Sequence, residues 1–136
     1  MSAAVVIDPA DPTPPYEQLR RQLAGYITTG ELPAGTRLSP VRQLAADLDL
    51  ANGTVARAYR ELEAAGLVHT RRGAGTTVLE QSPEATGEAR RARLAALAAA
   101  FVADSRRLQI TDADALAAVE AAQHGGIALA RERSPA

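Results

Sequence analysis

The residues best suited to bind another molecule are arginines and small polar residues between positions 42 and 73. A guanidinium group donates hydrogen bonds in a planar fork that matches phosphate oxygens and the edge of guanine, whereas asparagine pairs with adenine. The candidate contacts are Arg42, Asn52, Gly53, Thr54, Arg57, Arg71, Arg72 and Gly73. These residue types are typical of a nucleic-acid contact surface.

The residue types that enzymes need are absent or scattered. His69 and His124 stand far apart, and neither has histidines or carboxylates at metal-ligand spacing. The chain contains no cysteine, which excludes disulfides, thiol catalysis and thiolate metal sites. The glycine-rich stretch 73–75 lacks the lysine and hydroxyl of a phosphate-binding loop. We therefore expect no catalytic site, no metal and no cofactor.

Length and charge limit the classes of protein that remain. The 136 residues suffice for one domain of roughly 80 residues plus an appendage. The formal net charge is −1, so any basic surface must be local. No apolar run approaches the ~20 residues of a membrane span, and the N-terminus lacks a secretory pattern. We expect a cytoplasmic protein without a membrane partner.

Apolar residues at spacings of three and four predict three helices, over about 15–29, 40–48 and 52–65. Ser39 followed by Pro40 is expected to start the second helix, and Asn52 to cap the third. Gly66 should end the third helix in the left-handed conformation. With a turn at 49–51, the second and third helices form a helix-turn-helix, whose exposed polar face needs a partner.

A change of period after Gly66 predicts a β-hairpin. Residues 67–70 and 76–79 are short β-prone runs that flank a turn at 71–75. A helix-turn-helix followed by a hairpin is a winged helix. Six arginines could form one basic surface on it: Arg37, Arg42, Arg57, Arg60, Arg71 and Arg72.

The remaining segments lie outside that predicted domain of residues 16–80. Residues 1–15 contain two Asp-Pro pairs and are expected to be a flexible leader. Residues 81–126 should form two alanine-rich helices that end before Gly125 and Gly126, with a frayed tail at 127–136. Two such helices bury too little area alone, so they should dimerise or fold back on their own winged helix. The predicted dimer interface contains Leu94, Leu97, Phe101, Leu116 and Val119.

Residues 15–78 resemble the winged helix of the GntR family of bacterial transcription regulators. The resemblance lies in YEQLRRQLAGYITTGELPAGTRL, VRQLAADLDLANGTVARAYRELEAAGLV and TRRGAGTTV. It implies a mainly α fold with a small β-hairpin, and binding of a homodimer to an inverted repeat in double-stranded DNA. Arg42, the start of the third helix and Gly73 would touch the DNA. About 55 residues follow the hairpin, which resembles the short YtrA-type branch with a helix pair that dimerises.

The sequence departs from the usual family pattern at two places. Members usually have Leu-Pro-Ser before the arginine at position 42, but here the order is Leu38-Ser39-Pro40. A common serine-arginine pair is replaced by Ala51-Asn52. We therefore expect the base contacts to differ from those of other members.

Three hypotheses follow for the function. The first is a homodimeric repressor that places the third helix in the major groove and the hairpin on the backbone or in the minor groove. The second is a winged-helix adaptor that binds proteins without specific DNA binding. The third, the leader of an aminotransferase-like regulator, is disfavoured because no cofactor lysine or large domain follows. A small-molecule effector at the dimer interface stays open, although two short helices should leave little room.

Overall fold

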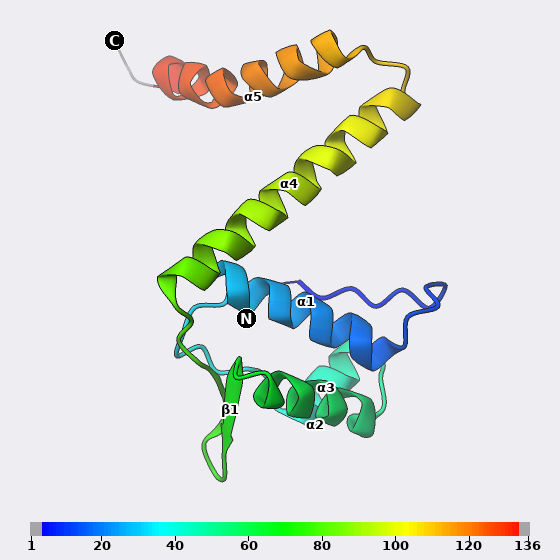
Figure 1. Ribbon diagram of the computed structural model, residues 1–136, viewed down its shortest axis with the longest axis vertical. Coiled ribbons are helices and arrows are strands. Elements are labelled where there is room, and N and C mark those ends of the chain that lie inside the picture. Colours follow the sequence, from blue (N-terminus) through cyan, green and yellow to red (C-terminus); the bar gives the residue numbers. More distant parts are fainter. Residues whose placement is uncertain (1–3, 134–136) are drawn as a thin grey trace. The chain divides into compact units, whose positions relative to one another are not determined.

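The computed structural model describes residues 4–133, and the side chains of residues 4–125. The chain divides into two compact units, Met1–Ala92 and Arg93–Ala136. The elements are α1 (Pro15–Thr29), α2 (Val41–Leu48), α3 (Asn52–Ala64), β1 (Val68–Arg71), β2 (Gly75–Val78), α4 (Pro83–Arg107) and α5 (Asp112–Arg133). β1 and β2 form an antiparallel hairpin (Figure 1). The predicted class, a mainly helical winged helix, is confirmed.

The core of the first unit forms where α1 packs on α3. Leu19 and Leu23 of α1 are fully buried, as are Val55 and Leu62 of α3. α3 also packs on α2 and β1. The predicted apolar spacings are confirmed in α1 and α3, whose buried apolar residues recur at three and four, whereas Val41 and Leu48 of α2 are only partly buried. One side of α3 is therefore fixed inside the domain, and its other side is left exposed.

The turn between α2 and α3 is held by backbone geometry and one tyrosine. Asp49 takes the left-handed conformation at φ +55°, and the Leu50 amide donates to the Ala45 carbonyl at 2.8 Å. The buried Tyr59 hydroxyl donates to the Ser39 carbonyl at 2.7 Å. This bond joins α3 directly to Ser39, two residues before α2 starts at Val41.

The helix starts differ from the prediction. Pro40 and Ala51 are the N-caps of α2 and α3, and neither forms a side-chain cap bond. The Thr54 and Val55 amides donate to the Ala51 carbonyl, so Asn52 is already the first helical residue and the prediction that it caps α3 was wrong. Gly66 does follow α3 with φ +77°, as predicted.

An extended segment at residues 36–38 pairs with the free edge of β2, which the sequence did not indicate. The Val78 amide donates to the Thr36 carbonyl at 2.8 Å, and the Leu38 amide donates to the Thr76 carbonyl at 2.8 Å. Arg37 lies opposite Thr77 in this ladder. The segment that leads into α2 is therefore fixed to the hairpin.

The leader is attached to α1, so the prediction that residues 1–15 are flexible was wrong for the described residues. The Val6 amide donates to Gln22 Oε1, and the Asp8 amide donates to Gln18 Oε1, at 2.9 and 2.8 Å. Each glutamine returns a bond from Nε2 to the carbonyl of the same residue. The four residues from Gln18 to Gln22 rise about 6 Å along α1, and the two residues from Val6 to Asp8 span about 6.6 Å when extended. The extended leader can therefore pair with both glutamines at once.

The first unit also extends beyond the predicted boundary at residue 80. Arg90 of α4 donates from Nε to the Thr29 carbonyl at the end of α1, at 2.8 Å. A cation at this position satisfies a carbonyl that the helix leaves without a partner. The first turns of α4 therefore belong to the winged-helix unit.

The second unit contains the rest of α4 and α5. Arg106 pairs with Asp112, with 2.9 Å between Nη2 and Oδ2, and the Asp114 amide donates to Thr111 Oγ1. α5 continues to Arg133 through Gly125 and Gly126, where its end was predicted. Good helix-forming residues on both sides outweigh the cost of about 1 kcal/mol per glycine. The prediction of a frayed tail from residue 127 was therefore wrong as far as Arg133. Residues 134–136 lie outside the described residues.

We expect the protein to lose stability at alkaline pH because of Tyr59. Burial raises its pKa to about 12, above the value of about 10 for an unfolded chain. The unfolded chain releases this proton first, so the contribution is complete below about pH 10 and is lost as pH rises toward about 12. Urea unfolding at pH 9 and 11 should show a smaller loss of stability for Tyr59→Phe than for the unmodified protein. An equal loss in both would contradict this account of Tyr59.

We expect Gln18 to hold the leader. It is 7% exposed and also donates to the Thr13 carbonyl, so Gln18→Ala leaves several partly buried backbone groups without partners. The free energy of unfolding should fall by about 1–3 kcal/mol in urea titrations. Gln43→Ala, at an exposed position of α2, is the control and should change it by less than about 0.5 kcal/mol. Equal effects of the two substitutions would show that the leader pairing does not stabilise the domain.

Candidate nucleic-acid interface

The start of α2 combines a cation with open backbone donors. Within the described residues, the amides of Val41, Arg42 and Gln43 have no hydrogen-bond partner, because the first helical bond is the one from Leu44 to the Pro40 carbonyl. Arg42 itself is exposed at the second helical position. Unpaired amides and the helix dipole favour an anion here, and the guanidinium adds a full charge.

The start of α3 has the same open character. The amides of Asn52 and Gly53 lack partners among the described residues, since the first bonds come from Thr54 and Val55. No atom lies within 4 Å of the position that a Cβ on Gly53 would take. By contrast, the starts of α4 and α5 are capped by the hydroxyls of Ser82 and Thr111. The two helices of the helix-turn-helix are thus open to a polar partner at their N-termini.

Arg57 lies on the exposed side of α3, as predicted, and is held by Glu61 one helical turn away and by Tyr16, which the sequence did not reveal. Its Cζ is 3.7 Å from the centre of the Tyr16 ring, and its Nε is 3.8 Å from Glu61 Oε1. A guanidinium over an aromatic face is attracted by the ring quadrupole. The side chain stays 53% exposed, so it is oriented without being covered.

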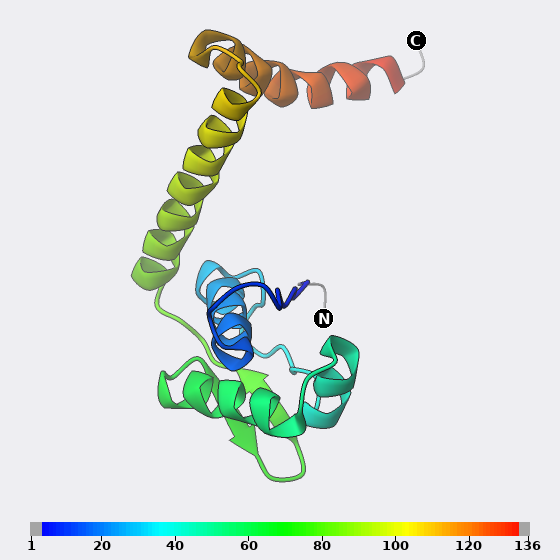
Figure 2. The same ribbon diagram turned by 90° about the vertical axis from the view of Figure 1, so that its right-hand side faces the viewer.

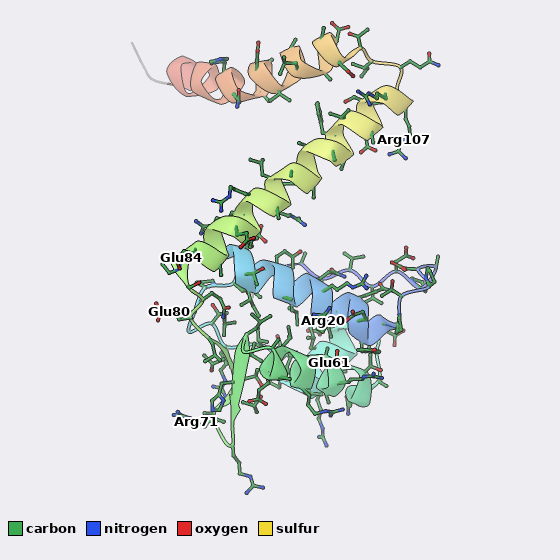
Figure 3. The ribbon with its side chains drawn as sticks, viewed as in Figure 1. Arg20, Glu61, Arg71, Glu80, Glu84 and Arg107 are labelled. Carbon is green, nitrogen blue, oxygen red and sulfur yellow. The ribbon has the colours of Figure 1, made fainter. Side chains whose placement is uncertain are left out.

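Arg20 of α1 extends this cluster. It pairs with Glu17 and lies 3.8 Å from Glu61 Oε2, so Glu61 is shared by Arg20 and Arg57 across the α1–α3 boundary (Figure 3). The hydrogen bond from Arg20 lowers the pKa of Glu17. This cluster neutralises part of the charge of Arg57 and fixes its direction.

Arg60 is a second basic residue on the outer side of α3. It is exposed and, within the described residues, takes part in no ion pair. Its distance of seven residues from Gly53 places both on the same helix face. The sequence placed Arg60 among the six arginines of a basic surface, but the periodicity gave no reason to rank it against Arg57. What distinguishes the two is the contact of Arg57 with Glu61 and with Tyr16, and only the fold supplies the contact with Tyr16.

The hairpin carries the remaining predicted contacts. Arg71 ends β1, and Arg72 and Gly73 form the turn, which the Ala74 amide closes by donating to the Arg71 carbonyl at 2.9 Å. All of them are exposed. Figures 1 and 2 place α2, α3 and the hairpin on the same side of α1, with the hairpin projecting beyond α3. The predicted site residues thus come from elements that lie together.

The five residues of the predicted dimer interface lie together in the second unit. Leu94, Leu97 and Phe101 of α4 and Leu116 and Val119 of α5 line one apolar groove of about 490 Å³. They are between 38% and 66% exposed in the single chain. The expectation that two short helices leave little room was therefore wrong for the isolated unit.

Other kinds of site find little support in the described part of the chain. No three side chains among histidine, cysteine, aspartate and glutamate gather there into a possible metal site. None of the helices that the structure describes is both long enough and apolar enough to cross a bilayer.

Comparison with known proteins agrees with the geometry. Residues 15–78 match the family described as bacterial regulatory proteins, gntR family. The HTH-type transcriptional regulator Rv1152 of Mycobacterium tuberculosis is 44% identical over 103 residues, which cover 76% of this chain and 80% of the relative. The repressor YtrA of Bacillus subtilis is 38% identical over 78 residues, covering 57% of this chain and 60% of YtrA.

Solved structures show the same fold. A GntR family regulator from Listeria monocytogenes has a TM-score of 0.57 and 29% identity, with 84% of this chain and 97% of that one covered. YtrA from Sulfolobus acidocaldarius has a TM-score of 0.54 and 30% identity, with 69% and 97% covered. The relatives are transcription regulators, which confirms that no enzyme is to be expected. The chain belongs to the GntR family of bacterial transcription regulators and carries its DNA-binding winged helix.

Proposed function

We propose that the protein is a homodimeric repressor that binds an inverted repeat in double-stranded DNA. α3 enters the major groove, and the hairpin lies on the backbone or in the minor groove. The observation that carries the proposal is the pair of uncapped helix starts, which present open amides beside Arg42, Asn52, Gly53 and Thr54. DNA phosphates and base edges supply the acceptors that these donors lack.

Base reading would centre on the outer side of α3. Asn52 can donate and accept as adenine requires, and Gly53 lets the backbone approach the groove closely. Tyr16 and Glu61 hold Arg57 beside these residues, so less side-chain entropy is lost when it binds. Arg71, Arg72 and Gly73 reach the DNA from the hairpin. Two protomers would place their α3 helices about 34 Å apart or at a multiple of that distance.

A second copy of the chain is the occupant that we propose for the apolar groove of the second unit. Large exposed apolar patches on a protein surface mark interaction sites, and the alanine-rich helices allow close approach. A second copy carries the same groove, in which Leu97 and Phe101 lie, and this suits a two-fold symmetric contact. An apolar small molecule could occupy this volume only by displacing the partner, so a separate effector site is not proposed.

The DNA contacts can be tested by fluorescence anisotropy with duplexes that the unmodified protein selects from a random library. Arg42→Ala and Arg57→Ala should each weaken binding about 10- to 100-fold, since each removes a charged hydrogen bond. Arg91→Ala removes the same charge from an exposed position of α4 and should leave affinity within about twofold. Unchanged affinity in both variants would contradict the assignment of Arg42 and Arg57 as DNA contacts. Failure to retain any duplex at physiological salt would favour the adaptor hypothesis.

The dimer can be tested by light scattering after size-exclusion chromatography. Phe101→Glu places a charge in the apolar groove and should convert a dimer into a monomer that still binds an isolated half-site. Leu108→Glu is the matched control, because Leu108 is 73% exposed and does not line the groove. A monomeric mass for the unmodified protein at micromolar concentration would contradict the proposed dimer, as would a dimeric mass for Phe101→Glu.

A further inference from the structure

We propose that Arg37 and Arg71, on either side of Gly75, together bind one phosphate of the DNA backbone. This inference deepens the proposed function and rests on it. Arg37 lies outside the helix-turn-helix and the hairpin, and the sequence placed it only among six arginines of one possible basic surface. In the folded chain, Gly75 and Arg71 lie beside Arg37 on the small sheet.

The three residues share one face of the small sheet. Arg71 lies directly opposite Gly75 on β2, and Arg37 lies opposite Thr77 on the other edge of the same strand. Side chains alternate between the two faces of a strand, so Gly75 and Thr77 point to one side and Thr76 and Val78 to the other. Thr76 and Val78 are buried. Arg37 and Arg71 therefore lie on the outer face and flank Gly75, and Figure 3 shows Arg71 on the hairpin.

Gly75 provides the space that the Arg37 guanidinium occupies. A Cβ built on Gly75 would lie 2.8 Å from Arg37 Nε, which is closer than real Cβ contacts allow, and 3.2 Å from its Nη2, so the guanidinium would have to shift. Gly75 also has φ +81°, a conformation that other residues adopt only with strain. The guanidinium thus lies directly over the strand backbone, in a position that depends on this glycine.

No carboxylate neutralises these two guanidinium groups in the part of the chain that the structure describes. Glu63, an acid that contacts the hairpin, accepts from the Thr70 amide and lies 3.4 Å from His69 Nδ1. Arg20, Arg57 and Arg106, by contrast, are all paired with acids. Two like charges on one small face repel each other, and an anion between them removes that cost.

A DNA phosphate is the anion that fits this position. Arginine forks bind phosphate oxygens with two parallel hydrogen bonds, and two forks that flank the same strand can reach one phosphate group. The same hairpin carries Arg72 and Gly73 at its tip, and residue 37 leads directly to the open start of α2 at Val41. A phosphate between Arg37 and Arg71 would therefore belong to the backbone that these elements follow.

The salt dependence of binding tests whether the two arginines act on the same phosphate. On a selected duplex, the slope of log affinity against log salt falls by about 0.9 for each phosphate that the protein no longer neutralises. Arg37→Gln and Arg71→Gln should each leave the slope nearly unchanged, because the remaining arginine still neutralises the phosphate, and the double variant should reduce it by about 0.9 per protomer. A reduction of about 0.9 in each single variant and about 1.8 in the double variant, or an unchanged slope in the double variant, would overturn the shared site.

Phosphate replacement gives an independent readout. A series of duplexes, each with one neutral methylphosphonate, should contain one position that weakens the unmodified protein and both single variants but leaves the double variant unaffected. Gly75→Ala should behave like Arg37→Gln, and Arg91→Gln should behave like the unmodified protein. Circular dichroism and the melting temperature verify that each variant is folded, and if Gly75→Ala unfolds, the arginine variants decide.

The possible failures are distinguishable. If the unmodified protein binds no duplex with a salt-dependent affinity, the proposed function fails and the phosphate site fails with it. If it binds, but the double variant keeps the sensitivity of the unmodified protein at every position of the series, or each single variant loses sensitivity at a different position, only the pairing of Arg37 with Arg71 is overturned.

Discussion

The structure depends on the packing of α3 against α1. Leu19 and Leu23 on one helix and Val55 and Leu62 on the other are removed from water, at about 1.5–3 kcal/mol for each side chain buried. A helix of 13 residues is marginal in water by itself, so this contact decides that α3 forms at all. It also decides which residues of α3 are left to face a partner.

Polar contacts fix the exposed side of α3 and the elements next to it. The Tyr59 hydroxyl fixes the approach to α2, and Glu61 and Tyr16 fix Arg57 at the boundary with α1. Residues 36–38 attach the same approach to the hairpin. Each element that carries a proposed DNA contact is therefore positioned by the buried core or by a neighbour of it. The open amides at the starts of α2 and α3 are left for the ligand to satisfy.

Local patterns predicted the helices, the hairpin and the left-handed Gly66, because apolar spacing and glycine conformation act within a few residues. Contacts between distant residues were not predictable in the same way. Gln18 and Gln22 pair with backbone ten and sixteen residues away, and Arg57 contacts Tyr16 forty-one positions earlier. The predicted cap at Asn52 was wrong by one residue, because Ala51 is the N-cap and Asn52 is already helical. The predicted helix end before Gly125 was wrong because good helix-forming residues on both sides outweigh the cost of the two glycines.

The most direct test of the central claim is an amide chemical-shift titration of the isotope-labelled protein with a duplex that it selects. The account predicts that the largest changes occur at the starts of α2 and α3, along the outer side of α3, and at residues 71–75. The leader and the buried side of α1 should change little. Largest shifts on the leader and α1, with α3 unaffected, would contradict the account.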